Sequence, residues 1–300
     1  MADKKLIALF VAGGALVLYS VARGKVRLAT HVDPSVYPHT QNKVTQLLQH
    51  HNASGAYWLG PVQGNGVVDP KHKHGSRATF IYVPQHFNAL APYELIYFFH
   101  GLTGFFKTPG GNMAHRVSKN LAEMDKDKRN YVLVFPELPW SYHTTTPNDR
   151  QRVVFNNSAQ EDFRTFYPET RKILKEHFQI KPNPSKIKLI GHSAGGSALR
   201  AISTAGMMDA IKPDSVLFSD ATYATWLDEF YRDYQDSSAT KIFLFNVVDP
   251  SPKKPYKQTQ RFFRARGGKP QNIEVVELRY GDGWSHKKIG DSILPMSAKY

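Results

Sequence analysis

The chain has 300 residues, 41% of them hydrophobic, which is enough to bury one large core, and no repeat or low-complexity tract interrupts it. The absence of cysteine excludes disulfides, thiolate metal sites and a cysteine nucleophile. An excess of 39 basic over 25 acidic residues attracts anionic partners such as envelope polymers or membrane surfaces, whereas no motif predicts specific binding of nucleic acid.

The first 22 residues are typical of an export signal. Lys4 and Lys5 precede an almost uninterrupted apolar run over residues 6–18. This run is shorter than the roughly 20 residues that a membrane-spanning helix prefers. Small residues at positions 20–22 suit a cleavage site. We expect a cleaved signal peptide and an exported protein, periplasmic or secreted; a signal anchor and a buried helix are the alternatives.

Residues 23–77 form a lead-in that holds the first strands, and residues 78–300 alternate β-rich runs with helical patterns. The β-rich runs are mostly too apolar for half-solvated strands, so we expect helices on both faces of the sheet. The expected strands are 78–83, 94–99, 131–135, 187–190, 215–218, 241–247 and 273–278. The expected helices are 113–124, 159–178, 195–208, 225–234 and 256–266. The pattern predicts an α/β fold with a mostly parallel, doubly wound sheet in a single catalytic domain.

The run GHSAGG follows one of these strands and opens a helix of small residues. This context is typical of a nucleophile elbow, a sharp turn that exposes a serine hydroxyl at a helix N-terminus. Gly191 and Gly195 have no side chains, so the turn can close tightly and the helix can pack on the strands. Ser193 is the predicted nucleophile.

A serine nucleophile needs a base, and in this arrangement the chain order is serine, acid, histidine. His286 is the only histidine after Ser193, and it follows the last predicted strand. Two aspartates compete for the acid. Asp249 occupies the commoner position but lies in a Lys-rich loop, whereas Asp220 is flanked by small and apolar residues that suit a buried carboxylate. We favour Asp220, with Asp249 as the alternative.

An oxyanion hole needs backbone N–H groups directed at the developing charge. We expect one from Ala194, directly after the nucleophile. The second is expected from Leu102, or from Thr103, in the HGLTG loop that follows the strand 94–99.

Two aromatic residues that follow strand ends, Trp140 and Tyr223, are candidates for lining the substrate pocket, and core packing is the alternative. The histidine pairs show no metal-ligand spacing such as H-E-x-x-H. We therefore expect neither a metal nor another cofactor.

Taken together, the HG-x-x-G loop, GHSAGG and the late SH motif resemble the α/β-hydrolase superfamily over residues 78–294. The run VLFSDATYATW is similar to a bacterial group with Asp-Ala-x-Tyr at this place, which adds to the case for Asp220. The sequence lacks the glycine that commonly precedes the acid at the position of Asp249. The resemblance implies a serine hydrolase, and we expect cleavage of a carboxylic ester through an acyl-enzyme. An amidase or peptidase, an acyltransferase and a non-catalytic envelope-binding protein are the alternatives.

Overall fold

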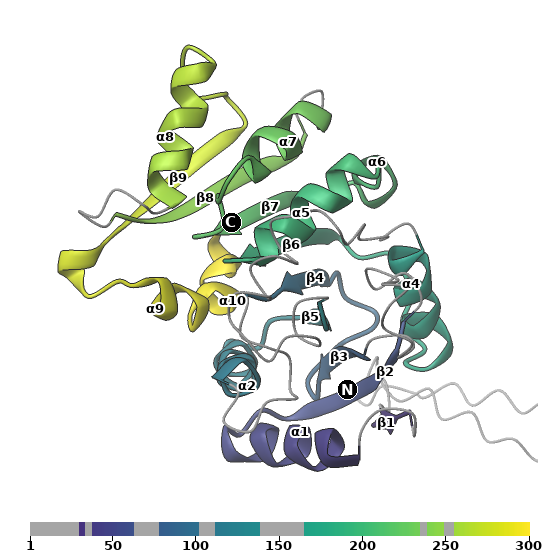
Figure 1. Ribbon diagram of the computed structural model, residues 1–300. Coiled ribbons are helices and arrows are strands. Elements are labelled where there is room, and N and C mark those ends of the chain that lie inside the picture. The colour runs from purple at the N-terminus through teal and green to yellow at the C-terminus, as the bar shows by residue number, and fades with distance from the viewer. Residues whose placement is uncertain are drawn as a thin grey trace, which may run out of the picture.

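A computed structural model describes residues 30–33, 38–62, 78–101, 112–138, 165–234, 239–248 and 255–300. Its centre is one nine-stranded sheet with the order β1-β2-β3-β5-β4-β6-β7-β8-β9 (Figure 1). The strands are β1 (His31–Val32), β2 (Gly55–Pro61), β3 (Ala78–Pro84), β4 (Glu94–Phe99), β5 (Tyr131–Pro136), β6 (Lys186–His192), β7 (Ser215–Ser219), β8 (Lys241–Val248) and β9 (Ile273–Arg279).

The strands from β4 to β9 all run parallel to their neighbours among themselves. Only β3 is antiparallel to the strands on its two sides, β2 and β5. The mostly parallel sheet predicted from the sequence is therefore confirmed. In such a sheet the carboxyl ends of the parallel strands meet at one edge, where ligands and chemistry gather.

Helices cover both faces of the sheet, as the apolar strands predicted (Figure 1). The first face packs against α4 (Phe166–Glu176), α5 (Gly195–Thr204), α6 (Met208–Ile211), α7 (Trp226–Asp233) and α8 (Pro255–Ala265). The opposite face packs against α1 (Pro38–His50), α2 (Asn112–Lys126), α9 (His286–Gly290) and α10 (Ile293–Met296).

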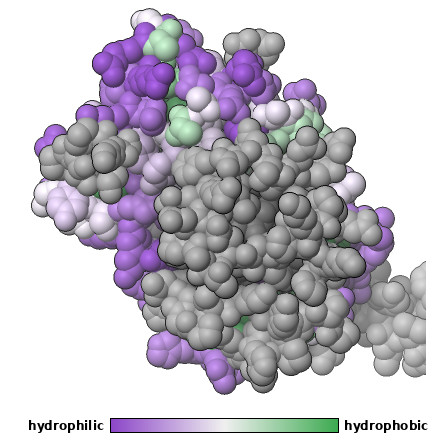
Figure 2. Space-filling view, in the orientation of Figure 1, coloured by the Kyte–Doolittle hydropathy of each residue, from purple (hydrophilic) through white to green (hydrophobic). Residues whose placement is uncertain are grey.

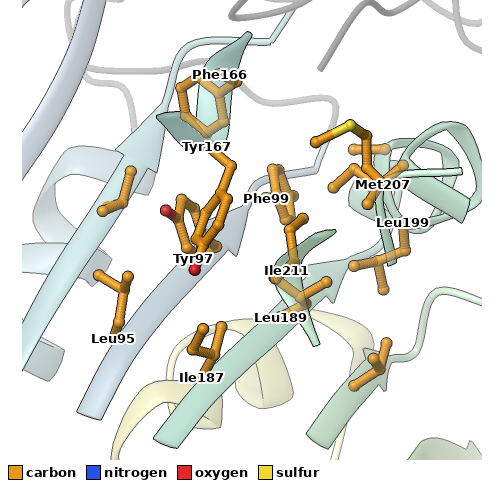
Figure 3. Close-up of a cluster of buried hydrophobic side chains, with 14 of the residues drawn as sticks. Leu95, Tyr97, Phe99, Phe166, Tyr167, Ile187, Leu189, Leu199, Met207 and Ile211 are labelled. Carbon is orange, nitrogen blue, oxygen red and sulfur yellow. The ribbon is translucent and has the colours of Figure 1, made fainter. Parts of the chain in front are cut away.

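Strand β4 shows how the alternation of side chains builds the two cores. Leu95, Tyr97 and Phe99 point to the first face (Figure 3), and Ile96 and Phe98 point to the second. All five are at most 2% exposed. Each such side chain contributes about 1.5–3 kcal/mol of burial free energy, so the strand is anchored on both faces.

The structure differs from the expected elements in several places. The expected helix 195–208 is divided into α5 and α6, because Gly206 has a left-handed φ of +70° that ends the first helix. Helix α1 lies inside the lead-in and was not expected, and neither were the short helices α9 and α10. Of the expected helix 159–178 the structure describes residues 165–178, and within them α4 begins at Phe166 and ends at Glu176.

The described surface in Figure 2 is mainly hydrophilic, with hydrophobic side chains in small patches. Within the described ranges, we find no helix with the length and apolar character that crossing a bilayer requires. The predicted export signal at residues 1–22 lies outside those ranges.

Candidate active site

Ser193 lies in the turn between β6 and α5, at the carboxyl edge of the sheet. Its φ of +54° is a left-handed value, which costs a residue other than glycine roughly 1–2 kcal/mol. Two backbone hydrogen bonds hold this conformation: the N–H of Ser193 donates to the carbonyl of Ser219 at 3.1 Å, and the N–H of Gly196 donates to the carbonyl of Ser193 at 3.1 Å. This is the strained turn expected of a nucleophile elbow.

The glycines around the serine are needed for close packing. A Cβ atom on Gly191 would lie 2.7 Å from the carbonyl oxygen of Gly195, and one on Gly195 would overlap the carbonyl of Phe99 on β4. Helix α5 can therefore begin directly against the strands only because both positions are glycine. The sequence prediction for these two residues is confirmed.

Asp220 and His286 form a hydrogen-bonded pair beside the elbow. Asp220 follows β7 and is 1% exposed, and its Oδ2 accepts a hydrogen bond of 2.6 Å from Nδ1 of His286. Its Oδ1 accepts from the N–H of Val247 at 3.3 Å, and its own N–H donates to the carbonyl of Phe245 at 2.7 Å. Because a carboxylate can only accept, Nδ1 of His286 carries a proton, and in the neutral imidazole the lone pair is then on Nε2.

His286 is the first residue of α9, and Ser285 caps that helix. The side chain of Ser285 accepts a hydrogen bond of 3.1 Å from the N–H of Lys288, which fixes the direction in which the helix starts. The His286 side chain is 37% exposed, so one side of the imidazole is open to solvent.

The ring of Tyr223 lies next to the hydrogen-bonded pair of Asp220 and His286. It meets His286 edge-on, with the centroids 6.2 Å apart, and packs on Trp226 at 5.8 Å. Burial raises the pKa of the Tyr223 hydroxyl and the charge of Asp220 raises it further, while a hydrogen bond with Ser193 acts in the opposite direction. The hydroxyl is therefore protonated at neutral pH and lies next to Ser193.

The turn at the end of β4 lies against Ser193. A Cβ atom on Gly101 would lie 3.0 Å from Cβ and 3.4 Å from Oγ of Ser193. His100 fixes this turn, because its Nδ1 donates to the carbonyl of Gly101 at 2.6 Å and its Nε2 accepts from the N–H of Leu138 at 3.1 Å. Burial lowers the pKa of His100 to about 4, so the ring is neutral.

The structure thus brings Ser193, His286 and Asp220 to one edge of the sheet. Ala194 is buried at the N-cap of α5, where the first N–H groups have no partner inside the helix. The other predicted site residues, Leu102, Thr103, Trp140 and Asp249, lie outside the described residues.

Sequence reasoning missed His192, which is fully buried and stacks on His286 with ring centroids 4.9 Å apart. The sequence feature that could have indicated this contact is the position of His192 in the GHSAGG motif, directly before Ser193. In the part of the chain that the structure describes, no three His, Asp or Glu side chains group in a way that could hold a metal ion.

No protein-family model and no curated protein sequence matches this chain. Among solved structures, a ferulic acid esterase of Anaeromyces mucronatus in complex with ferulic acid is similar at 13% identity and a TM-score of 0.51, covering 81% of this chain and 88% of that one. A dienelactone hydrolase-like promiscuous phosphotriesterase from metagenomic libraries has 12% identity and a TM-score of 0.46, covering 75% and 82%. At such identities the likeness concerns the fold, and the predicted α/β-hydrolase fold is confirmed.

Proposed function

We propose that this protein is a serine hydrolase that cleaves carboxylic esters, with Ser193 as nucleophile, His286 as general base and Asp220 as the acid that orients it. The observation that carries the proposal is the 2.6 Å hydrogen bond between Asp220 Oδ2 and His286 Nδ1 beside a serine with a left-handed φ. A strained serine turn and an imidazole oriented by a carboxylate, both at the same edge of the sheet, are two features that an acyl-transfer site requires.

In the acylation step, Nε2 of His286 takes the proton of the Ser193 hydroxyl while Oγ attacks the ester carbonyl carbon. The imidazolium that forms faces the buried carboxylate of Asp220, which stabilises its charge. His286 then gives the proton to the leaving alcohol, and the acyl group remains on Ser193. A water molecule then gives a proton to the same Nε2 and attacks the acyl carbon. The bond from that carbon to Ser193 Oγ breaks, the acid leaves, and Oγ takes the proton from His286.

The negative charge on the substrate oxygen needs donors that are already in place. We propose the N–H of Ala194 as the first donor, because it lies at the N-terminus of α5, where the helix dipole also favours negative charge. The second donor is proposed from Leu102 or Thr103, which directly follow Gly101. The contact that a Cβ of Gly101 would make with Ser193 supports this, because the backbone of that turn lies against the nucleophile.

An ester is the preferred substrate class because its alcohol leaves more readily than the amine of an amide, and no further catalytic group is needed. Tyr223 is proposed to contact the substrate, since its protonated hydroxyl lies next to Ser193 on the side of His286. We also propose export through residues 1–22, and an envelope-derived or lipid-linked ester would suit export and the net charge of +14.

Labelling with a fluorophosphonate probe tests the nucleophile. The purified protein should form one adduct, on Ser193, and hydrolyse short p-nitrophenyl esters. Ser193→Ala should abolish both, whereas Ser197→Ala, a change of the same kind four residues further on in α5, should retain both. A folded wild-type protein that takes up no label would contradict the proposal. Sequencing the mature N-terminus tests export, for which a start beyond Ala22 is expected.

A further inference from the structure

His192 lies directly beneath the proposed general base. It is the last residue of β6 and is 2% exposed. Its ring stacks on that of His286 with an interplanar angle of 28° and a centroid distance of 4.9 Å. The residue that precedes the nucleophile in the chain therefore supports the imidazole that activates the nucleophile.

The His192 ring is fixed in one orientation. Its Nδ1 donates to the carbonyl oxygen of Ser219 at 3.0 Å, and the same oxygen accepts the N–H of Ser193 at 3.1 Å. Burial lowers the pKa of His192 well below its ordinary value; the neighbouring His286 and Arg116 lower it further, whereas the hydrogen bond to the Ser219 carbonyl acts in the opposite direction. The ring is therefore neutral and does not repel a proton that arrives on His286.

The opposite edge of the same ring contacts the far end of α9. A Cβ atom on Gly290 would lie 2.5 Å from Nε2 of His192, so only glycine allows the helix to lie this close. The next residue, Asp291, pairs with Arg116 of α2 at 2.6 Å, and Ile289 is fully buried. The ring of His192 thus contacts both the first and the last residue of α9.

Helix α9 has only five residues, and a helix this short has no stability of its own in water. Its position must come from the contacts that it makes. We infer that His192 is a positioning residue that sets the place of α9 and thereby holds His286 within reach of Ser193. The inference rests on the proposed role of His286 as general base.

Gly290→Ala tests this contact from a residue that takes no part in the chemistry. The added methyl group must displace either α9 or the His192 ring. We expect kcat to fall about 10- to 100-fold with little change in KM, because a shift of about 1 Å in a catalytic group has an effect of this size. Gly281→Ala is the matched control: it lies in the short 3₁₀ helix Tyr280–Asp282 before α9, a Cβ atom there meets nothing within 4 Å, and kcat should be unchanged.

His192→Asn completes a double-mutant cycle, since the smaller side chain makes room for a methyl group at position 290. Adding Gly290→Ala to His192→Asn should then lower kcat much less than it does in the wild-type background. An equal loss in both backgrounds, or a Gly290→Ala variant with full kcat, would overturn the inference.

If Gly290→Ala does not fold, an NMR measurement on His192→Asn tests the inference instead. The proton shared by His286 and Asp220 should give a downfield NMR resonance in the wild-type protein, and His192→Asn should broaden or remove it whether or not substrate is present. An unchanged resonance together with an unchanged kcat would also refute the inference. Failure of the proposed function is distinguishable, because it would appear as wild-type activity that is absent or that survives Ser193→Ala.

Discussion

Replacing Asp220 by Asn should nearly abolish catalysis while leaving the fold intact. Asn fits the left-handed backbone of this position, φ +47°, as well as Asp does, and its carbonyl oxygen can still accept the N–H of Val247. Its amide group, however, donates toward Nδ1 of His286. The imidazole proton must then move to Nε2, which can no longer accept the proton of Ser193.

The size of the loss follows from the geometry. At 2.6 Å, a carboxylate and an imidazolium attract each other by about 6 kcal/mol with an effective dielectric constant of 20. Because the His286 side chain is 37% exposed, solvent weakens this attraction. A loss of about 4–5 kcal/mol remains, which corresponds to roughly a 10³- to 10⁴-fold lower kcat and agrees with the effect of the same substitution in a serine protease triad, about 10⁴.

The assay is steady-state hydrolysis of a short p-nitrophenyl ester near neutral pH, with circular dichroism to verify folding. Asp214→Asn is the matched control, because Asp214 also accepts a backbone N–H, that of Ile187 at 2.8 Å, but at the opposite edge of the sheet. An Asp220→Asn variant within tenfold of wild type would refute the reasoning. A large loss in Asp249→Asn instead would transfer the acid role to that residue.

Three further predictions concern the proposed active site and the stability of the fold around it. Tyr223→Phe should lower kcat at least about tenfold on alkyl esters, because the hydroxyl next to Ser193 is lost; equal rates of the two proteins would exclude a substrate contact. Glu94→Ala should lower the free energy of unfolding by about 3–5 kcal/mol in urea titrations, because Lys188, 1% exposed and 3.3 Å from Glu94, would remain buried without its counter-ion; a loss below about 1 kcal/mol would contradict this. His100 titrates near 6.5 when unfolded and near 4 when folded, so the unfolded state binds the extra proton between these values. The free energy of unfolding should therefore fall by about 3 kcal/mol on acidification from pH 6.5 to 4, and His100→Asn should flatten this part of the pH profile; an unchanged profile would exclude His100 as the cause.

Much of the fold could be predicted from the sequence, because the residue patterns that identify strands and turns are local. Strand β4 was expected at 94–99 and is found at Glu94–Phe99, since a strand buried on both faces reads as a continuous apolar run between polar ends. The elbow was equally visible, because a sharp turn between strand and helix demands glycines at fixed spacing around the serine. Helix α1 was missed, because it lies at the margin of the sheet and carries many polar residues.

The sequence by itself determined the fold class, the serine that we propose as nucleophile and the only histidine downstream of it. The tertiary structure decided which side chains contact His286. The Asp220 carboxylate and the His286 ring are 66 positions apart, and they meet because β9 and α9 return the chain to the end of β7. The stack of His192 on His286 and the contact of His192 with Gly290 have the same origin. Hydrogen bonds and ring contacts between distant segments depend on how the strand ends are packed, and no local pattern of residues encodes that packing.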